Sequence, residues 1–406
     1  MVRIDENRLW DRLMEIAQIG GTPKGGVCRV TLTEEDKKGR ELFISWCKSI
    51  GCTVRIDNMG NIFAKYPGGD NSLPSILIGS HLDSQPTGGK YDGVLGVLSA
   101  LEVCETLHEK QIVTDRPIEI VSWTNEEGAR FSPAMIGSGV FAGEFTLDYA
   151  YQREDKEGLT LGGELEKIGH KGSDIIDPSE FYASLELHIE QGPILEKEEK
   201  KIGVVTGVQG IRWYEIQIDG KECHAGPTPM SYRTDPVMVL PKLINKFYEI
   251  GEKYAPDSRI TIGSIRTKPG VTNTVPGSIN LTLDIRNPEQ SILDEMHLEA
   301  QTVVRECDQD SKASVTLHEV WHSPSVRFAS QCIDAVQAAA EASDYSHRKL
   351  VSGAGHDSVY ISKVIPTSMI FIPCKDGLSH NELESIEKED AIAGTNVLLN
   401  AVLNIK

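Results

Sequence analysis

The chain has 406 residues, more than a single hydrophobic core usually supports, so two domains are expected. Its formal net charge of −19 and the lack of a clustered basic stretch argue against a nucleic-acid partner, and no apolar run reaches the roughly 20 residues of a membrane span. Eight cysteines without a C-x-x-C pair, and an N-terminus without the features of a secretion signal, predict a cytoplasmic protein.

The first half of the chain carries the pattern of a parallel α/β domain. Two short apolar runs, at 75–80 (SILIGS) and 118–123 (IEIVSW), follow prolines and lead into polar clusters, which predicts buried strands. Between them, apolar residues recur at helical spacing over 93–108, so the order is strand, loop, helix, strand. Ligand-binding loops are expected at the carboxyl ends of such strands.

A different pattern begins near residue 207. Apolar and polar residues alternate over 213–222, 260–265 and 279–285, around a helical stretch. This alternation predicts an inserted α+β domain with an antiparallel sheet.

The chain then returns to the first pattern. Helical spacing over 328–342, an apolar run at 367–372 and a closing helix at 388–403 follow Pro324. We therefore predict a discontinuous α/β catalytic domain whose mixed, mainly parallel sheet is flanked by helices. The predicted boundaries are 1–208 with 325–406 for this domain and 209–324 for the insert.

Three residues suited to divalent cations follow the first predicted strand, in GSHLDSQPTGGKYDG. On extended backbone His81 and Asp83 share a face, so the Asp83 carboxylate can accept a hydrogen bond from the imidazole and fix its tautomer. Asp92 comes after a Gly-Gly turn that can bring its carboxylate back beside His81, as a bridge between two ions. A His-x-Asp pair is common without a metal, so only other ligand-type residues nearby make a metal site the better interpretation.

Two adjacent acids, Glu126 and Glu127, follow the second predicted strand in WTNEEGARF. Successive residues at a strand end project to opposite sides, so one carboxylate can bind a metal while the other acts as a general base on water. The alternative is an exposed acidic helix start, which would be the better interpretation of this pair taken alone.

Two further stretches supply histidines. The alternation in LELHIEQG places His188 and Glu190 on one face and Gln191 on the other, and His380 lies in the loop DGLSHNE after another strand. Three histidines with two or three carboxylates match the N/O ligand set of zinc, manganese, cobalt or nickel. The sequence has no G-x-S-x-G elbow, H-E-x-x-H helix, P-loop or dinucleotide fingerprint that would indicate other chemistry.

These residues resemble a known family, the M20-type metallo-aminoacylases and carboxypeptidase-like peptidases. The resemblance is to its branch of N-carbamoyl-L-amino acid hydrolases, β-ureidopropionases and allantoate amidohydrolases, and it spans nearly the whole chain. The stretches that carry it, in the family's order, are GSHLDSQPTGGKYDG, NEEGARF, ELHIEQGPILE, HAGPTPM, NTVPG to LDIR, SGAGHDS and DGLSHNE.

The resemblance implies a zinc-peptidase-like catalytic domain that holds two divalent ions per subunit, zinc first, with manganese, cobalt or nickel as alternatives. It implies Glu126 as the general acid/base, with Asp83 beside the ligands. The implied metal ligands, with Asp92 bridging, are His81, Asp92, Glu127, His188 and His380.

The resemblance also implies roles for the insert, as a ferredoxin-like lid and dimerisation domain of a homodimer. His224 in HAGPTPM matches a histidine that reaches the substrate carbonyl, often across the dimer interface. Gln191, Asn273 and Arg286 match substrate-binding positions, and Arg286 can grip a carboxylate bidentately unless it forms only a surface ion pair. Pro227 departs from the small residue of many relatives, which puts the shape of the substrate in doubt.

The expected activity is hydrolysis of the carbamoyl group of an N-carbamoyl α- or β-amino acid to amino acid, carbon dioxide and ammonia. Allantoate hydrolysis is the alternative, because the same residues would serve it. A dipeptidase or a non-catalytic binding protein is less favoured, since binding alone would not need an unligated Glu126. His356 and Asp357, in a glycine-rich loop, could equally contact substrate or stabilise the loop.

Overall fold

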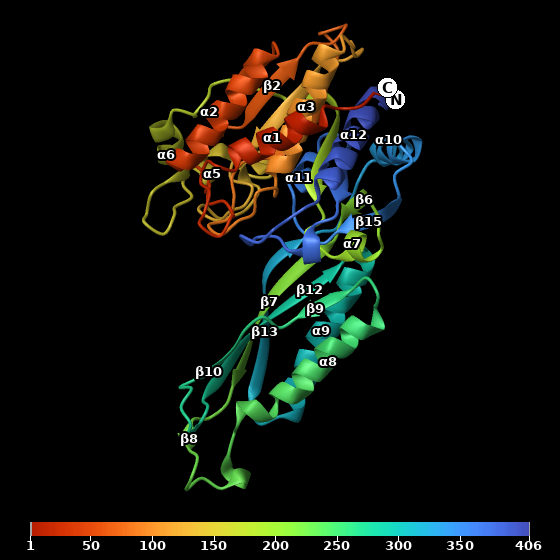
Figure 1. Cartoon of the computed structure of the whole chain (residues 1–406). Coiled ribbons are helices and arrows are strands. Elements are labelled where there is room, and N and C mark those ends of the chain that lie inside the picture. The colour runs from red at the N-terminus through yellow and green to blue at the C-terminus, as the bar shows by residue number, and fades with distance from the viewer. Residues whose placement is uncertain (1, 406) are drawn as a thin grey trace. The chain divides into compact units, whose positions relative to one another are not determined.

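The computed structural model describes residues 2–405, and the chain divides into two compact units. The first unit comprises Met1–Thr206 with Arg327–Lys406, and the second comprises Gly207–Val326. In the first unit both ends of the chain lie together (Figure 1), where the Ile4 amide donates to the side chain of Asn396 at 3.1 Å. No helix among residues 2–405 is both long and apolar enough to cross a bilayer.

A large mixed sheet forms the centre of the first unit. Its principal strands are β1 (Thr53–Ile56), β2 (Ile62–Tyr66), β3 (Ser75–His81), β4 (Ile118–Trp123), β5 (Phe181–Ile189), β6 (Ile202–Val208), β15 (His347–Ser352) and β16 (Thr367–Ile372). They run in the order β1-β2-β4-β3-β5-β16-β6, and β15 also pairs with β6. The neighbours from β4 to β16 are parallel, whereas β1, β2 and β6 pair antiparallel. The predicted mixed, mainly parallel sheet flanked by helices is confirmed.

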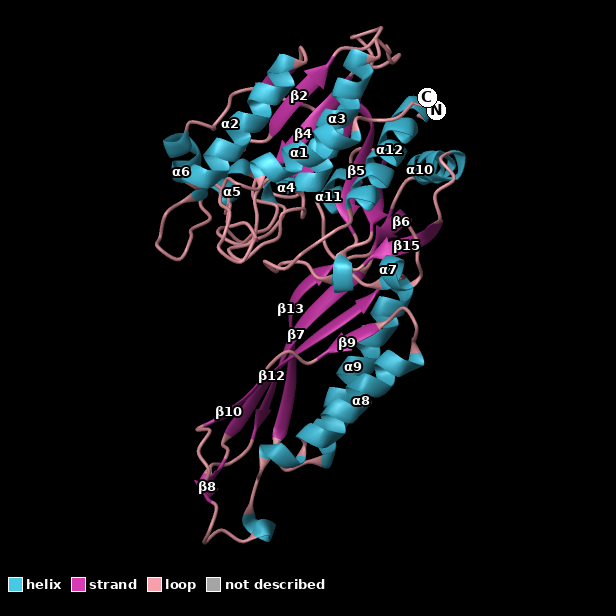
Figure 2. Cartoon of the chain, in the orientation of Figure 1, coloured by secondary structure: helices cyan, strands magenta, loops and turns pink. Residues whose placement is uncertain are grey.

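Helices cover both faces of this sheet (Figure 2). The helices of this unit are α1 (Glu6–Ile16), α2 (Glu34–Ser49), α3 (Val94–Glu109), α4 (Ile136–Phe141), α5 (Leu147–Tyr151), α6 (Leu161–Ile168), α7 (Ile194–Lys197), α10 (Ser330–Ala342), α11 (Ser358–Ile361) and α12 (Lys388–Asn404). On one face α3 lies between the strands and the helices α1 and α12, so it is buried nearly all round and shows no polar stripe. On the other face α4 and α11 pack near a smaller aromatic cluster.

The second unit is an antiparallel α+β structure. Its sheet has the order β10-β12-β7-β13, with β9 also paired to β12, and two long helices pack against it. Its elements are β7 (Gly210–Asp219), β8 (Cys223–His224), α8 (Leu240–Lys253), β9 (Arg259–Thr261), β10 (Ile265–Lys268), β11 (Thr274–Val275), β12 (Ser278–Asn287), α9 (Gln290–Asp310) and β13 (Ser314–Ser323). The short strand β14 (Val326–Arg327) spans the boundary residues of the two units.

The predicted single strand over 260–265 is wrong. The chain forms β9 and β10 instead, and the segment between them breaks the pairing because the backbone amide of Ser264 and the carbonyl of the same residue both bond to Thr282. All eight cysteines are free thiols.

The all-round burial of α3 can be tested at Leu101, which has no exposed surface. Leu101→Ala should lower the free energy of unfolding by about 2–5 kcal/mol, because a buried cavity replaces the side chain. Val113→Ala is the control, because Val113 is 70% exposed, and it should change the free energy of unfolding by less than about 0.5 kcal/mol. Urea unfolding followed by circular dichroism measures both, and equal midpoints for the two variants would contradict the packing.

Candidate metal centre

His81 is the last residue of β3, and its ring is buried. Its Nδ1 lies 2.9 Å from the backbone carbonyl oxygen of Asp83. A carbonyl can only accept a hydrogen bond, so Nδ1 carries the proton and Nε2 keeps its lone pair. Burial also lowers the pKa of His81 to about 4, so the ring is neutral near pH 7. A neutral imidazole with a free Nε2 is the form that binds a metal.

The expected role of the Asp83 carboxylate is corrected by this geometry. The carboxylate lies 3.8 Å from His81 Nδ1, beyond hydrogen-bond distance, and the main-chain carbonyl of the same residue takes the proton. The carboxylate instead accepts the backbone N–H groups of Glu126 and Glu127, each at 3.3 Å. Asp83 therefore orients the loop that carries the two acids, because the turn after β3 directs its side chain toward the end of β4.

A first group of donors forms around Oδ1 of Asp92. His188 lies near the carboxyl end of β5, and its Nδ1 is 2.9 Å from the Ile189 carbonyl oxygen, which leaves Nε2 facing Asp92 and the Gly93 N–H, 3.3 Å away. That Nε2 is 3.1 Å from Asp92 Oδ1, and Nε2 of His81 is 3.8 Å from the same oxygen. Ligand atoms of these three residues all lie within 4.8 Å of one another.

A second group forms around the other oxygen of Asp92. His380 Nε2 is 3.5 Å from Asp92 Oδ2 and 3.2 Å from Glu127 Oε2. Gln85 holds the Glu127 carboxylate, donating from its backbone N–H at 3.1 Å and from its side-chain amide at 2.7 Å. The structure thus brings together all five residues expected to bind metal, in two groups that share one carboxylate.

Gly93 makes this proximity possible. Its φ is +68°, and a Cβ there would lie 2.3 Å from ring atoms of His81. A side chain cannot fit, so the glycine lets the Asp92 backbone pass against the imidazole before α3 begins.

The electrostatics of the cluster favour positive charge beside Asp92. Burial alone would raise the pKa of Asp92, but the hydrogen bond and charge of His188, with His81 and His380, hold it far below its usual value. Burial opposes a charge on His188, yet Asp92 raises the pKa of that imidazole to about 9. Asp92 therefore favours positive charge at His188 Nε2, which lies 3.1 Å from its Oδ1.

Glu126 occupies a different position from its neighbour. Its Oε2 is 3.4 Å from His81 Nε2, and it is not among the donors grouped around Asp92. Burial raises the pKa of Glu126 well above its usual value, and the negative charges of Asp357 and Glu127 add to this effect. A carboxyl group with a raised pKa, beside metal-type ligands, can both take and return a proton.

The expected alternation after β5 is wrong beyond Ile189. Gln191 has a φ of +56°, which turns its side chain to the cluster, where Nε2 donates to Asp92 Oδ2 at 2.9 Å. Its Oε1 is buried without a hydrogen-bond partner. Glu190 turns away, and its carboxylate accepts the backbone N–H groups of Ile194 and Leu195 at the start of α7. A left-handed residue at a strand end breaks the period-2 pattern.

Several polar groups at the cluster were not singled out from the sequence. Ser379 donates to Asp92 Oδ2 at 2.8 Å, and Glu384 accepts the Asp92 backbone N–H at 3.1 Å. Glu186 accepts hydroxyl hydrogen bonds from Ser80 at 2.7 Å and Ser358 at 2.6 Å. The only sequence signal for them is their closeness to His81, His188 and His380.

The glycine-rich loop lies next to the cluster. The ring of His356 meets that of His188 edge-on, with centroids 4.6 Å apart, and its Nε2 is 3.0 Å from the hydroxyl of Ser352. Asp357 accepts a short hydrogen bond from Ser138, while its Oδ2 is buried without a partner.

The other expected site residues lie in the second unit. His224 is exposed in β8, which pairs with β11, and the Gly226 N–H donates to its Nδ1 at 3.1 Å, so Nε2 carries the proton. The carbonyl of Asn273 accepts the Ala225 N–H at 2.9 Å, which places Asn273 beside His224. Arg286 lies on β12, where Asp284 holds its guanidinium at 2.7 to 3.1 Å.

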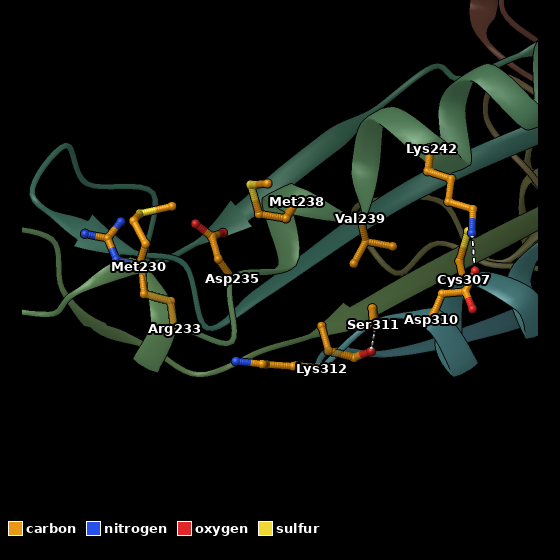
Figure 3. Close-up of a pocket in the computed structure, with 11 residues that line it drawn as sticks. Met230, Arg233, Asp235, Met238, Val239, Lys242, Cys307, Asp310, Ser311 and Lys312 are labelled. Carbon is orange, nitrogen blue, oxygen red and sulfur yellow. Dashed lines mark hydrogen bonds and ion pairs between the residues drawn. The ribbon is translucent and has the colours of Figure 1, made fainter.

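A cavity of about 340 Å³ in the second unit contains none of the expected site residues (Figure 3). All three of its cationic side chains already have partners: Lys242 pairs with Asp310 at 2.5 Å, Lys312 donates to the Ser231 carbonyl at 3.1 Å, and Arg233 donates to the Ala225 carbonyl at 2.6 Å. Its chemistry does not indicate a catalytic centre.

Comparison with known proteins finds relatives over nearly the whole chain. A curated N-carbamoyl-L-amino-acid amidohydrolase from Rhizobium meliloti is 45% identical over 401 residues, covering 99% of this chain and 96% of that protein. An allantoate amidohydrolase from Bacillus subtilis (strain 168) is 30% identical over 403 residues, covering 98% of each. The crystal structure of an amidase of the hydantoinase/carbamoylase family from Burkholderia multivorans matches with a TM-score of 0.96 and 48% identity, covering 99% of this chain and 98% of that one. The family model described as Peptidase family M20/M25/M40 matches residues 77–404, and the chain belongs to this family.

Proposed function

We propose that this protein hydrolyses the carbamoyl group of N-carbamoyl L-α- or β-amino acids, with two divalent metal ions as cofactors. The names of its relatives support the substrate class. The observation that carries the proposal is the position of Asp92, whose Oδ1 faces His81 and His188 while Oδ2 faces Glu127 and His380. A single carboxylate with separate donors at each oxygen fits a bridge between two cations.

The donor set suits these ions chemically. His81 and His188 would hold one ion, Glu127 and His380 the other, and Asp92 both. Three imidazoles with carboxylates fit zinc best, and also accommodate manganese, cobalt or nickel. When bound, such ions lower the pKa of a water molecule and polarise the carbonyl of a substrate.

Glu126 supplies the proton transfers. It accepts a proton from the water that attacks the ureido carbon, and its raised pKa, caused by burial and neighbouring carboxylates, favours the protonated form. It then gives the proton to the nitrogen that leaves as ammonia. The remaining carbamate breaks down to carbon dioxide and the amino acid.

The polar side chains around the cluster and in the second unit orient the substrate. Arg286, already oriented by Asp284, binds the substrate carboxylate, and Asn273 adds a neutral donor. His224, whose Nε2 carries its proton, donates to the ureido oxygen as negative charge develops there. Gln191 contributes its buried, unpartnered Oε1 as an acceptor.

Glu126→Gln tests the proton transfers. Ammonia release from N-carbamoyl amino acids should fall by about 10²–10⁴-fold, because the amide cannot accept the proton from water. The metal content and the substrate KM should stay near wild type, since Glu126 is not among the grouped donors. Glu157→Gln, at an exposed position, is the control. Equal activity of Glu126→Gln and wild type, or full turnover by wild type after exhaustive chelation, would refute the mechanism.

Allantoate amidohydrolase is the alternative function, supported by the relative from Bacillus subtilis. Allantoate carries two ureido groups and one carboxylate, so the same residues could serve it. The donors around Asp92 do not separate the two substrates, and only their relative kcat/KM can.

Arg286→Leu tests how the substrate is recognised. It should raise KM about 10–100-fold for N-carbamoyl amino acids, because a charge-assisted hydrogen-bonded pair is lost. N-carbamoyl amines without a carboxylate should be unaffected. Arg259→Leu is a matched control, because Arg259 pairs with Arg286 across the sheet but donates to backbone carbonyls. An unchanged KM would rule out this role, and a wild-type kcat/KM higher for allantoate would favour the alternative.

We further infer that the enzyme is a homodimer in which the second unit serves as lid and dimerisation domain, and in which His224 acts across the interface. The exposure of His224 within its own unit supports this inference. The active enzyme should therefore sediment as a dimer.

Mixing two inactive variants tests directly whether His224 of one subunit acts in the site of its partner. Subunits with Glu126→Gln and subunits with His224→Ala, denatured together and refolded, should regain activity, because each mixed dimer then holds one complete site. Active monomers in sedimentation, or no recovery after confirmed exchange of subunits, would contradict the inference.

A further inference from the structure

A buried glutamate joins the two loops that carry Asp92 and His380. Glu384 is 5% exposed and lies four residues after His380. Its Oε1 accepts the backbone N–H groups of Tyr91 at 2.9 Å and of Asp92 at 3.1 Å. The partners are separated from it by nearly 300 residues, so this carboxylate is a tertiary link between the loops.

The loop before Asp92 is shaped to receive this carboxylate. A Cβ on Gly89 would lie 2.0 Å from the Glu384 carboxyl carbon, so only a glycine leaves room for it. The backbone thus curves around the carboxylate from Gly89 to Asp92, and places two N–H groups against one oxygen.

Ser379 forms the second side of the link. Its hydroxyl oxygen is 2.8 Å from Asp92 Oδ2 and 3.2 Å from Glu384 Oε2. The Asp92 backbone is thus fixed through one oxygen of Glu384, and its carboxylate contacts a hydroxyl that neighbours the other. Because Ser379 directly precedes His380, the same contacts bear on both groups of metal-type ligands.

We propose that Glu384 is a positioning residue for the metal centre, which sets the orientation of the Asp92 carboxylate by holding its backbone and the His380 loop together. The inference rests on the proposed two-ion centre. Groups that orient metal ligands contribute substantially to metal affinity without touching the ion. Glu384 acts in this way through hydrogen-bond acceptance, so an uncharged acceptor of the same length should replace it.

Three substitutions of Glu384 separate acceptance from charge. Glu384→Ala removes the acceptor. Glu384→Asp keeps the charge, but its side chain is one methylene shorter, so the carboxylate lies farther from the two N–H groups. Both should weaken zinc binding by about 10–100-fold. Glu384→Gln keeps an oxygen for the two N–H groups and should bind zinc nearly as wild type does. Glu382→Ala is the control on the same loop, where the side chain is only partly buried and pairs with Lys24.

The measurement is zinc binding by the full-length protein, stripped of metal and titrated in competition with a chromophoric chelator. Circular dichroism and the urea midpoint of the stripped protein establish that each variant is folded, and the Asp and Gln variants carry the test if Glu384→Ala does not fold. Wild-type zinc affinity in Glu384→Asp, or equal losses in the Gln and Asp variants, would overturn the inference. If wild type itself took up none of zinc, manganese, cobalt and nickel, the proposed function would fall, and this inference with it.

Discussion

One buried carboxylate, that of Asp92, is the element on which the rest of the cluster depends. Imidazoles surround it, and backbone carbonyls hold Nδ1 of His81 and of His188, so the Nε2 atoms of these two rings face the carboxylate. The carboxyl groups of Glu126 and Glu127 lie close by, and burial together with neighbouring negative charges raises the pKa of each. Bound cations would relieve the repulsion among these carboxylates. This electrostatic feature supports the proposed two-ion centre.

Much of the catalytic unit could be predicted from the sequence because its strands are short, apolar and bounded by prolines. The run at 118–123 coincides with β4, and 367–372 coincides with β16. The predicted M20-type family is confirmed as well. The five residues expected to bind metal lie at or after the ends of strands of the sheet, His380 in the loop after β16. The strand ends bring them together. Periodicity thus predicted which segments converge.

Details that depend on single backbone torsions could not be predicted. Gln191 adopts a left-handed conformation that no alternation rule anticipates, and His81 bonds to the carbonyl of Asp83 instead of its carboxylate. Glu384 carries no local pattern, because its partners are distant in sequence. The break between β9 and β10 likewise arises from hydrogen bonds with Thr282 that a propensity argument cannot include.

The helix α3 has a consequence for how this scaffold can change. It starts directly after Gly93, so the residue shared by both donor groups is anchored to the most deeply embedded helix of its unit. A substitution that shifts this helix would also displace Asp92, so substitutions in α3 would disturb the donor groups. Divergence toward new ureido compounds would have to come from solvent-accessible positions, such as those around Arg286 if it binds the substrate as proposed, while the inner framework stays constant. Chemistry and selectivity can then evolve independently.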